Sequence, residues 1–209
     1  MAFPTPEWDL ALFKLINMQW RNDVFDFLMP IFSDRMMVWV IAIPLLLITG
    51  IKTKKWRHLL IGLAIIGATV GANDIGTNII KDSVGRVRPK DAIAQSYHYS
   101  YKKAEWLQRP ANFIQTDDHG SSFISGHASN SAAAVVMAML LWPKLRSFLW
   151  ILPLLIGYSR VYLAKHYPLD VLGGWAFGIC ISLILWKVLL HRFYPSWDEP
   201  EKQISEQQS

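Results

Sequence analysis

Five long apolar segments, separated by charged loops, constrain most strongly what this chain can fold into. They run over roughly 36–51, 57–82, 126–143, 147–166 and 168–190. A helix of about 20 apolar residues crosses the hydrocarbon core of a bilayer, and fewer suffice when its ends lie in the interface. The pattern therefore predicts an all-α fold, a polytopic bundle of five or six transmembrane helices.

Composition agrees with a membrane protein. Of the 209 residues, 52% are hydrophobic and only 18% are charged, and the charges cluster between the apolar segments. The net charge of +5 would suit a nucleic-acid binder. However, the basic residues flank apolar segments and form no soluble basic face, so we predict no nucleic-acid partner. Cys180 is the only cysteine, so no intrachain disulfide can form.

Basic residues in the loops predict the orientation. Three connections on one side of the predicted bundle carry them, with Lys52, Lys54, Lys55 and Arg57 in the first, Lys144 and Arg146 in the second, and Lys187 and Arg192 in the third. By the positive-inside rule this side is cytoplasmic. The N-terminus and the long loop 89–124 then face outward.

The N-terminal segment 1–35 differs from the apolar segments. Within 7–33, apolar side chains are spaced for one face of a helix and are interrupted by charged residues. This pattern predicts an amphipathic helix lying in the membrane plane. The alternative is a sixth span over 12–32, which would have to bury Arg21, Asp23 and Asp26.

The remaining chain divides into two parts. Residues 36–192 form the predicted membrane domain. The tail 193–209 is polar, and we expect it to be a disordered cytoplasmic segment.

Ionisable residues gather at the ends of the apolar segments in three blocks, the first of which, 81–89, reads KDSVGRVRP. On a continued helix, Lys81 and Arg88 would lie on one face about 10 Å apart. Gly85 and Pro89 favour loosening of the helix there, which would bring the two cations closer. Arginine can grip two phosphate oxygens, whereas lysine acts as a mobile point charge. Snorkelling to the interface is the alternative.

The second block, Ser125-Gly126-His127, opens the third apolar segment. Ser125 is a favourable helix N-cap, so the amides of Gly126 and His127 would be free donors, and such a helix N-terminus binds anions. Gly126 also permits close approach of a ligand. His127 would then lie beside the anion; the alternative is an ordinary interfacial histidine.

The third block joins the fourth and fifth segments. Arg160 lies near the outer end of the fourth, and His166 and Asp170 are four residues apart around Pro168, which suits the first turn of a helix. A carboxylate that accepts from one imidazole nitrogen leaves the other as a neutral lone pair, which makes a nucleophile or a base. A purely structural His–Asp hydrogen bond is the alternative.

Together, the blocks resemble the motifs of a known family. The pattern K-x6-RP, then SGH, then SR-x5-H-x3-D is similar to that of the type 2 phosphatidic acid phosphatase superfamily over about 57–190. Ile124 departs from the family, which usually has proline before Ser-Gly-His, at a position that contributes no catalytic atom. The resemblance implies a membrane lipid phosphatase that needs no metal and no cofactor.

The resemblance also implies roles for the site residues. His166 would attack phosphorus and form a phosphohistidine, Asp170 would orient it, and His127 would protonate the departing oxygen. Five residues would surround the phosphoryl oxygens: Lys81, Arg88, Ser125, Gly126 and Arg160. Their cations would stabilise the transferring phosphoryl group and would repel a metal ion.

Two further regions remain open to two interpretations. Asp74 and Asn78 belong to a polar stripe of the second apolar segment, and Asp74 precedes Lys81 by seven residues. An intramembrane carboxylate is a functional candidate, so the pair either supports the site as a second shell or hydrogen-bonds neighbouring helices. The loop 90–122 interleaves aromatic and basic residues, which suits either an acidic headgroup or a folded cap.

By family analogy, the expected substrate is an envelope lipid at the outer, periplasmic face of a bacterial inner membrane. Candidates are lipid A, undecaprenyl pyrophosphate, phosphatidylglycerophosphate and phosphatidic acid. Phosphotransfer to another lipid would use the same residues. A non-catalytic lipid-binding or transport protein is the alternative of a different class, and it predicts that His166→Ala keeps function. The sequence carries no signal of oligomeric state.

Overall fold

The computed structural model of the protein describes residues 4–143 and 146–190, and most of them are helical. The predicted tail 193–209 lies outside the described residues. The α-helices are α1 (Glu7–Lys14), α2 (Asp23–Phe32), α3 (Arg35–Thr53), α4 (Trp56–Val84), α5 (Pro89–Ala92), α6 (Gly126–Leu141), α7 (Arg146–Leu149), α8 (Ile151–Tyr162) and α9 (Pro168–Leu185). Single π-helical turns follow α1 and α9, at Leu15–Gln19 and Trp186–Leu190.

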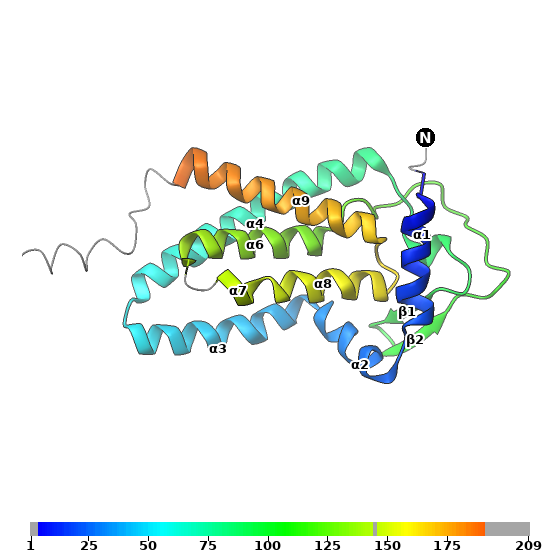
Figure 1. The fold of residues 1–209 in the computed structure, drawn as a ribbon, viewed down its shortest axis with the longest axis horizontal. Helices are drawn as coiled ribbons and strands as arrows, with labels where there is room; N and C mark the ends of the chain where they lie inside the picture. Colours follow the sequence, from blue (N-terminus) through cyan, green and yellow to red (C-terminus); the bar gives the residue numbers. More distant parts are fainter. Residues whose placement is uncertain (1–3, 144–145, 191–209) are drawn as a thin grey trace, which may run out of the picture.

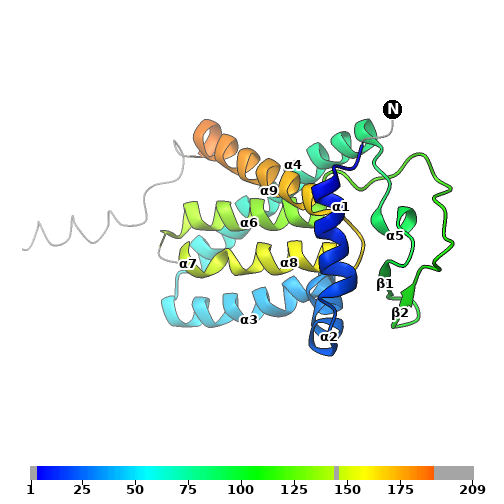
Figure 2. The ribbon, with the colours of Figure 1, turned by 45° about the vertical axis from the view of Figure 1, so that its right-hand side comes forward.

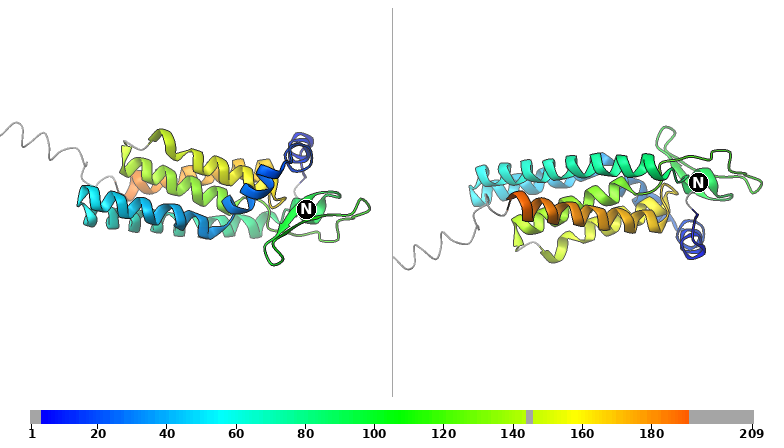
Figure 3. Two further views of the ribbon diagram at one scale, coloured as in Figure 1. Left: turned by 90° about the horizontal axis from the view of Figure 1, so that it is seen from below. Right: turned by 90° about the horizontal axis from the view of Figure 1, so that it is seen from above.

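The long helices run side by side in an elongated bundle (Figures 1 and 3). The central helix α6 packs against α4, α8 and α9. Its contact with α9 is close because two glycines of α9 leave no room for a side chain. A Cβ atom on Gly174 would lie 2.6 Å from the Ser125 carbonyl oxygen, and one on Gly178 would collide with the Ser129 carbonyl. Small residues of this kind let helix backbones approach each other closely.

Two helical stretches in the described part of the chain are long and apolar enough to cross a membrane, Trp56–Ala92 and Pro168–Val188. The apolar helices α6 and α8 are shorter. Large apolar side chains on the outside of α4, such as Ile75 and Ile79, are more than 60% exposed, as expected of a surface that meets lipid. The five predicted segments coincide in position with the long helices, but their number as spans stays a prediction.

The N-terminal segment forms two helices where one was predicted. The chain leaves helical geometry at Trp20, and α2 starts anew with Asn22 as its N-cap, whose side chain accepts from the amide of Phe25. A capping asparagine favours a helix start at this point. α1 lies across the end of the bundle (Figure 2). A continuous sixth span over 12–32 does not fit this break.

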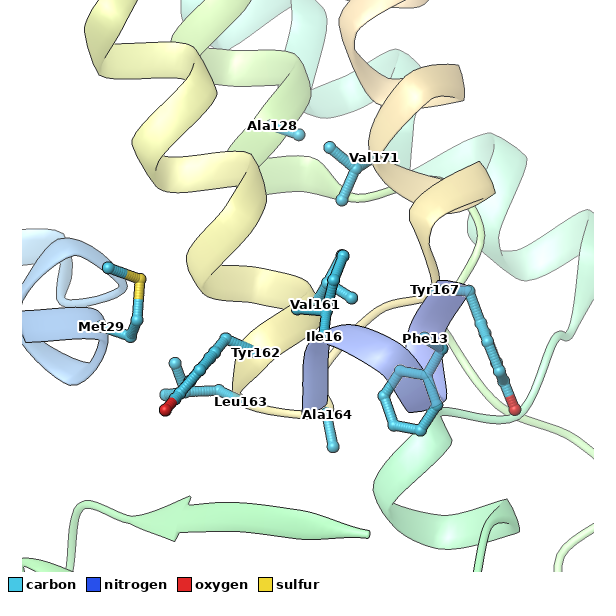
Figure 4. Close-up of a cluster of buried hydrophobic side chains, with 10 residues drawn as sticks. All are labelled: Phe13, Ile16, Met29, Ala128, Val161, Tyr162, Leu163, Ala164, Tyr167 and Val171. Carbon is cyan, nitrogen blue, oxygen red and sulfur yellow. The ribbon is translucent and has the colours of Figure 1, made fainter. Parts of the chain in front are cut away.

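A buried hydrophobic cluster fastens the N-terminal segment to the bundle (Figure 4). Phe13 and Ile16 from the N-terminal segment meet Tyr162 at the end of α8 and Tyr167 at the start of α9. The rings of Phe13 and Tyr167 lie 5.6 Å apart. The cluster therefore holds α1 against the end of the bundle where α8 gives way to α9.

The long loop between α4 and α6 is a folded cap with a two-stranded antiparallel sheet, which the all-α prediction missed. Strands β1 (Tyr97–Ser100) and β2 (Glu105–Gln108) pair with Tyr97 opposite Gln108. The buried Asn17 binds both backbone groups of Tyr97, at 2.8 and 2.9 Å. Four-residue strands give too little alternation for a sequence pattern to reveal them.

Candidate active site

The three ionisable blocks meet at one end of the bundle, where α4 and α8 end and α6 and α9 begin (Figure 1). A cavity of about 320 Å³ opens there. Six of the predicted site residues line it: Lys81, Arg88, Gly126, His127, Arg160 and His166. Residues from three separate blocks of the sequence therefore line one cavity.

Gly85 ends α4 and sets the course of the first block. Its φ of +65° is left-handed backbone, which glycine adopts without the steric cost of a Cβ, and its amide donates to the Lys81 carbonyl (3.1 Å). Arg88 then lies outside α4, as the N-cap residue of α5 with Pro89 following. The predicted loosening of the helix is confirmed, and both Lys81 and Arg88 reach the cavity.

The second block opens α6 as the sequence indicated. The Ser125 hydroxyl caps the helix by accepting from the amide of Ala128, and Ser125 is fully buried. Gly126 faces the cavity, and a Cβ atom there would lie 3.0 Å from Lys81 Nζ. Ser125 itself does not line the cavity, and its predicted contact with the phosphoryl group stays a prediction.

His166 is oriented by a backbone carbonyl. Its Nδ1 lies 2.7 Å from the carbonyl oxygen of Ser122, which can only accept, so Nδ1 carries the proton. Asp170 Oδ2 is 3.7 Å from the same nitrogen, too far for a hydrogen bond. The expected Asp170–His166 hydrogen bond is therefore replaced by one to Ser122, and the carboxylate acts across a short gap through its charge. Nε2 of His166 keeps its lone pair.

Asp170 is fully buried and is held by three donors. Arg86 donates to Oδ1 (2.5 Å), whereas the Ser122 hydroxyl (2.5 Å) and the Tyr167 amide (2.8 Å) donate to Oδ2. Sequence reasoning did not assign a role to Arg86 or Ser122. Arg86 is a third cation of the first block, beside Lys81 and Arg88, and its position there could have indicated a role in the site. Nothing in the sequence distinguishes Ser122.

The surroundings keep His166 neutral. Burial of the imidazole lowers the pKa of His166 to about 4, and the positive charges of Arg160 and Arg88 act in the same direction. Asp170 opposes them and raises the pKa. At neutral pH the side chain is therefore an unprotonated imidazole at the wall of a cationic cavity.

Four further lining residues were not among the predicted site residues: Ser33, Asp34, Tyr101 and Lys165, the last of which directly precedes His166 within the third block. Arg160 donates to the hydroxyl of Ser33, at the junction of α2 and α3. The Lys165 ammonium lies over the ring of Tyr101, 4.6 Å from its centroid. Ser33, Asp34 and Tyr101 reach the cavity only through the tertiary fold, so spacing in the sequence could not reveal them. Lys165 stands at a position of the third block to which the motif assigns no residue type.

The two residues considered for a second shell lie elsewhere. Asp74 and Asn78 are exposed on α4, and neither lines the cavity. Asp74 accepts a hydrogen bond from Asn130 (3.1 Å), which also accepts from Asn73 (2.6 Å). These contacts link α4 with α6, and a role of Asp74 and Asn78 in supporting the site stays a prediction.

The cavity suits an anion. Four cationic side chains line it: Lys81, Arg88, Arg160 and Lys165. Among the described residues, no group of three or more histidine, cysteine or acidic side chains is placed to hold a metal ion. Fixed cations beside two histidines can bind a phosphoryl group and attack it.

A helical bundle that presents a cationic, two-histidine cavity at one end defines a class of phosphate-ester enzymes that act at membranes. The PAP2 superfamily matches residues 58–194, and the chain belongs to this superfamily. The predicted resemblance is therefore confirmed, as is the prediction of a lipid phosphatase at the level of the enzyme class.

Relatives and solved structures agree with this assignment. An undecaprenyl-diphosphatase from Sulfolobus acidocaldarius is 31% identical over 85% of this chain and 76% of its own length. A putative undecaprenyl-diphosphatase from Escherichia coli is 27% identical over 89% of this chain and 86% of its own length. Further relatives are named as lipid A phosphatases and as a phosphatidylglycerophosphatase. The crystal structure of Aquifex aeolicus LpxE shares the fold, with a TM-score of 0.62 over 90% of this chain and 99% of that chain, at 21% identity.

Proposed function

We propose that this protein is an integral membrane phosphatase that hydrolyses a phosphomonoester or diphosphate of an envelope lipid through a phosphohistidine on His166. The observation that carries the proposal is the state of His166. The Ser122 carbonyl holds its Nδ1, burial keeps the ring neutral, and the side chain lines a cavity with four cations. This arrangement matches what a nucleophilic imidazole requires.

In the first step, the phosphoryl group lies among Lys81, Arg88 and Arg160, and His166 Nε2 attacks phosphorus. The bond between phosphorus and the oxygen of the leaving group breaks, and His127 in its protonated form gives its proton to that oxygen. The phosphorylated imidazole is cationic, and the Asp170 carboxylate 3.7 Å away stabilises it. Positioning and charge supply most of the catalysis in such a transfer.

In the second step, water attacks the phosphohistidine. His127, now neutral, accepts a proton from the water, the bond between nitrogen and phosphorus breaks, and His166 regains its lone pair. Inorganic phosphate leaves the cationic cavity. Every step uses side chains of this chain, with no metal or cofactor.

For the substrate, we favour a polyprenyl diphosphate. Two relatives, matched over 76% and 86% of their own lengths, are named as an undecaprenyl-diphosphatase and as a putative undecaprenyl-diphosphatase. Lipid A, phosphatidylglycerophosphate and phosphatidic acid are the competing substrates. All are membrane lipids with a terminal phosphoryl group, which is the part that the cavity would bind.

We further propose a multi-pass protein of five spans in a bacterial inner membrane, with the cavity on the periplasmic side. The distribution of charge supports this placement. The connection between α3 and α4, at the end of the bundle opposite the cavity, exposes Lys52, Lys54, Lys55 and Arg57 (Figure 1). Such basic connections face the cytoplasm.

Phosphate release by the purified protein in detergent, from the four lipids with EDTA present, tests the function. Wild type and the control His58→Ala, which changes an exposed histidine at the start of α4, should release phosphate from one lipid, whereas His166→Ala should not. Equal release by His166→Ala, or none from any lipid by wild type, would refute the proposal. Loss of lipid phosphate to another lipid without free phosphate would indicate phosphotransfer.

A further inference from the structure

Arg86 joins the buried carboxylate beside His166 to a second buried carboxylate on the N-terminal helix. Its guanidinium donates to Asp170 Oδ1 and to Asp9 Oδ2, both at 2.5 Å. Arg86 is only 2% exposed, and Asp9 and Asp170 are fully buried. Removing three charged groups from water costs free energy, so the loss of any one of them would leave its partners buried without a compensating charge.

Asp9 also holds the start of α9, the helix that carries Asp170. Its other oxygen, Oδ1, accepts from the amide of Leu169 (2.8 Å), a donor that the helix itself leaves without a partner. The Arg86 guanidinium lies over the ring of Tyr167, 4.0 Å from its centroid, and also donates to the hydroxyl of Thr5 (3.2 Å). The N-terminal segment thus fixes both the guanidinium and the turn that follows His166.

The balance of charge explains why a second carboxylate is present. Arg86 alone would neutralise the charge of Asp170. The neutral pair would then stabilise the cationic, phosphorylated imidazole only weakly. With Asp9 added, two anions face one cation, and the cluster keeps one net negative charge beside His166. In a low-dielectric interior that remaining charge acts strongly on a cation less than 4 Å away.

We propose that Asp9 and Arg86 are positioning residues for catalysis: Asp9 keeps Arg86 from cancelling the charge of Asp170, and α1 is therefore part of the catalytic machinery. The inference rests on the proposed role of His166 as nucleophile. Neither residue touches the cavity, so both would act through Asp170.

Other charged groups also act on His166 and must stay constant in a test. Arg160 from α8 and Arg88 from the start of α5 lower its affinity for a proton, and Asp170 from α9 raises it. Lys81, His127, Lys165 and Asp34 share its cavity. Substitution at Asp9 leaves all of these side chains in place.

The test compares Asp9→Asn with wild type, using the full-length protein in detergent. Asparagine keeps the size of the side chain and removes its charge. We expect kcat to fall about tenfold with KM within about twofold, because the interaction lost is made in the transition state. The matched control is Asp26→Asn, which breaks the Arg21–Asp26 ion pair (2.6 Å) of the same segment away from Asp170. It should keep kcat at the wild-type value.

A binding measurement without lipid separates this inference from the proposed function. Orthovanadate, which adopts the five-coordinate geometry of phosphoryl transfer, should bind wild type more tightly than inorganic phosphate does. Asp9→Asn should lose about tenfold of its vanadate affinity and little of its phosphate affinity. If wild type shows no preference for vanadate, the proposed function fails and this inference fails with it. If wild type and Asp9→Asn show the same preference, only the positioning role is overturned.

Arg86→Lys provides a second variant in case Asp9→Asn does not fold. Lysine keeps the positive charge but lacks the planar fork that binds two carboxylates at once. The same selective loss of vanadate affinity is expected. An unchanged ratio of vanadate to phosphate affinity in this variant would contradict the positioning role.

Discussion

At the scale of single residues, the ionisation of His166 connects stability with chemistry. Its ring is almost fully buried, and burial lowers its pKa to about 4. The neutral form supplies the lone pair for attack. The same burial makes the folded protein sensitive to acid, because the unfolded chain would protonate this histidine first.

We therefore predict a pH-dependent difference in stability between wild type and His166→Gln. Below the unfolded pKa of about 6.5, the unfolded state of wild type binds a proton that the folded state does not. Its stability should fall, relative to His166→Gln, by about 1.4 kcal/mol per pH unit between pH 6.5 and 4. Chemical denaturation in detergent at pH 7.5, 6.5 and 5.5 measures this difference, with His58→Gln as the control. A difference that does not change with pH would show that His166 titrates alike in both states.

The residue scale also shows where the sequence was sufficient and where it was not. Six cavity-lining residues followed from the three motifs, because helix ends that pack together bring their terminal residues into one place. Ser33 and Tyr101 could not be found in this way, since they come from a helix junction and a cap whose position depends on tertiary contacts. The partner of His166 Nδ1 is a backbone carbonyl, which no residue type reveals.

At the scale of elements, the geometry of the site depends on how closely α6 and α9 approach each other. Gly126 and His127 lie in the first turn of α6, and Asp170 lies in the first turn of α9. The backbone of Ser125 donates to the Asp170 carbonyl (2.9 Å), so the two helix starts are directly linked. The apolar segments predicted these helices well. The break near Trp20 and the short strands escaped prediction, because a capping asparagine and four-residue strands carry weak patterns.

Gly178→Ala should loosen this helix pair. The added Cβ would collide with the Ser129 carbonyl, and the shift that relieves it should cost about 1–3 kcal/mol of stability and lower activity. Gly67→Ala is the matched control. A Cβ there meets nothing within 4 Å, so alanine should be neutral or slightly stabilising in the helix. Thermal unfolding of both variants in detergent measures the effect, and equal midpoints would contradict the packing described.

At the scale of the whole molecule, the bundle has two unlike ends. One end carries the cavity, and α1, α2 and the cap that contains β1 and β2 lie at this end (Figures 1 and 2). The other end exposes the basic connection between α3 and α4. The loop charges predict that the basic end is the cytoplasmic one, because short basic loops mark the cytoplasmic side.

Single cysteines introduced into a Cys180→Ser background test this placement. Lys102→Cys, in the exposed turn of the cap, should react in intact cells with a maleimide that cannot cross the membrane. Lys54→Cys, exposed at the opposite end, should react only after the membrane is permeabilised. The reverse labelling pattern would place the cavity on the cytoplasmic side.

The central claim, a phosphohistidine on His166, is tested most directly by trapping it. In His127→Ala, a substrate whose leaving group needs no proton, such as p-nitrophenyl phosphate, should still phosphorylate His166, whereas water would lack its base. After a rapid quench at high pH, mass spectrometry should find a phosphoryl group on the peptide that contains His166, and none in the His127→Ala/His166→Ala double variant. Turnover by His127→Ala with no phosphorylated His166, or a phosphoryl group on another residue, would contradict the account.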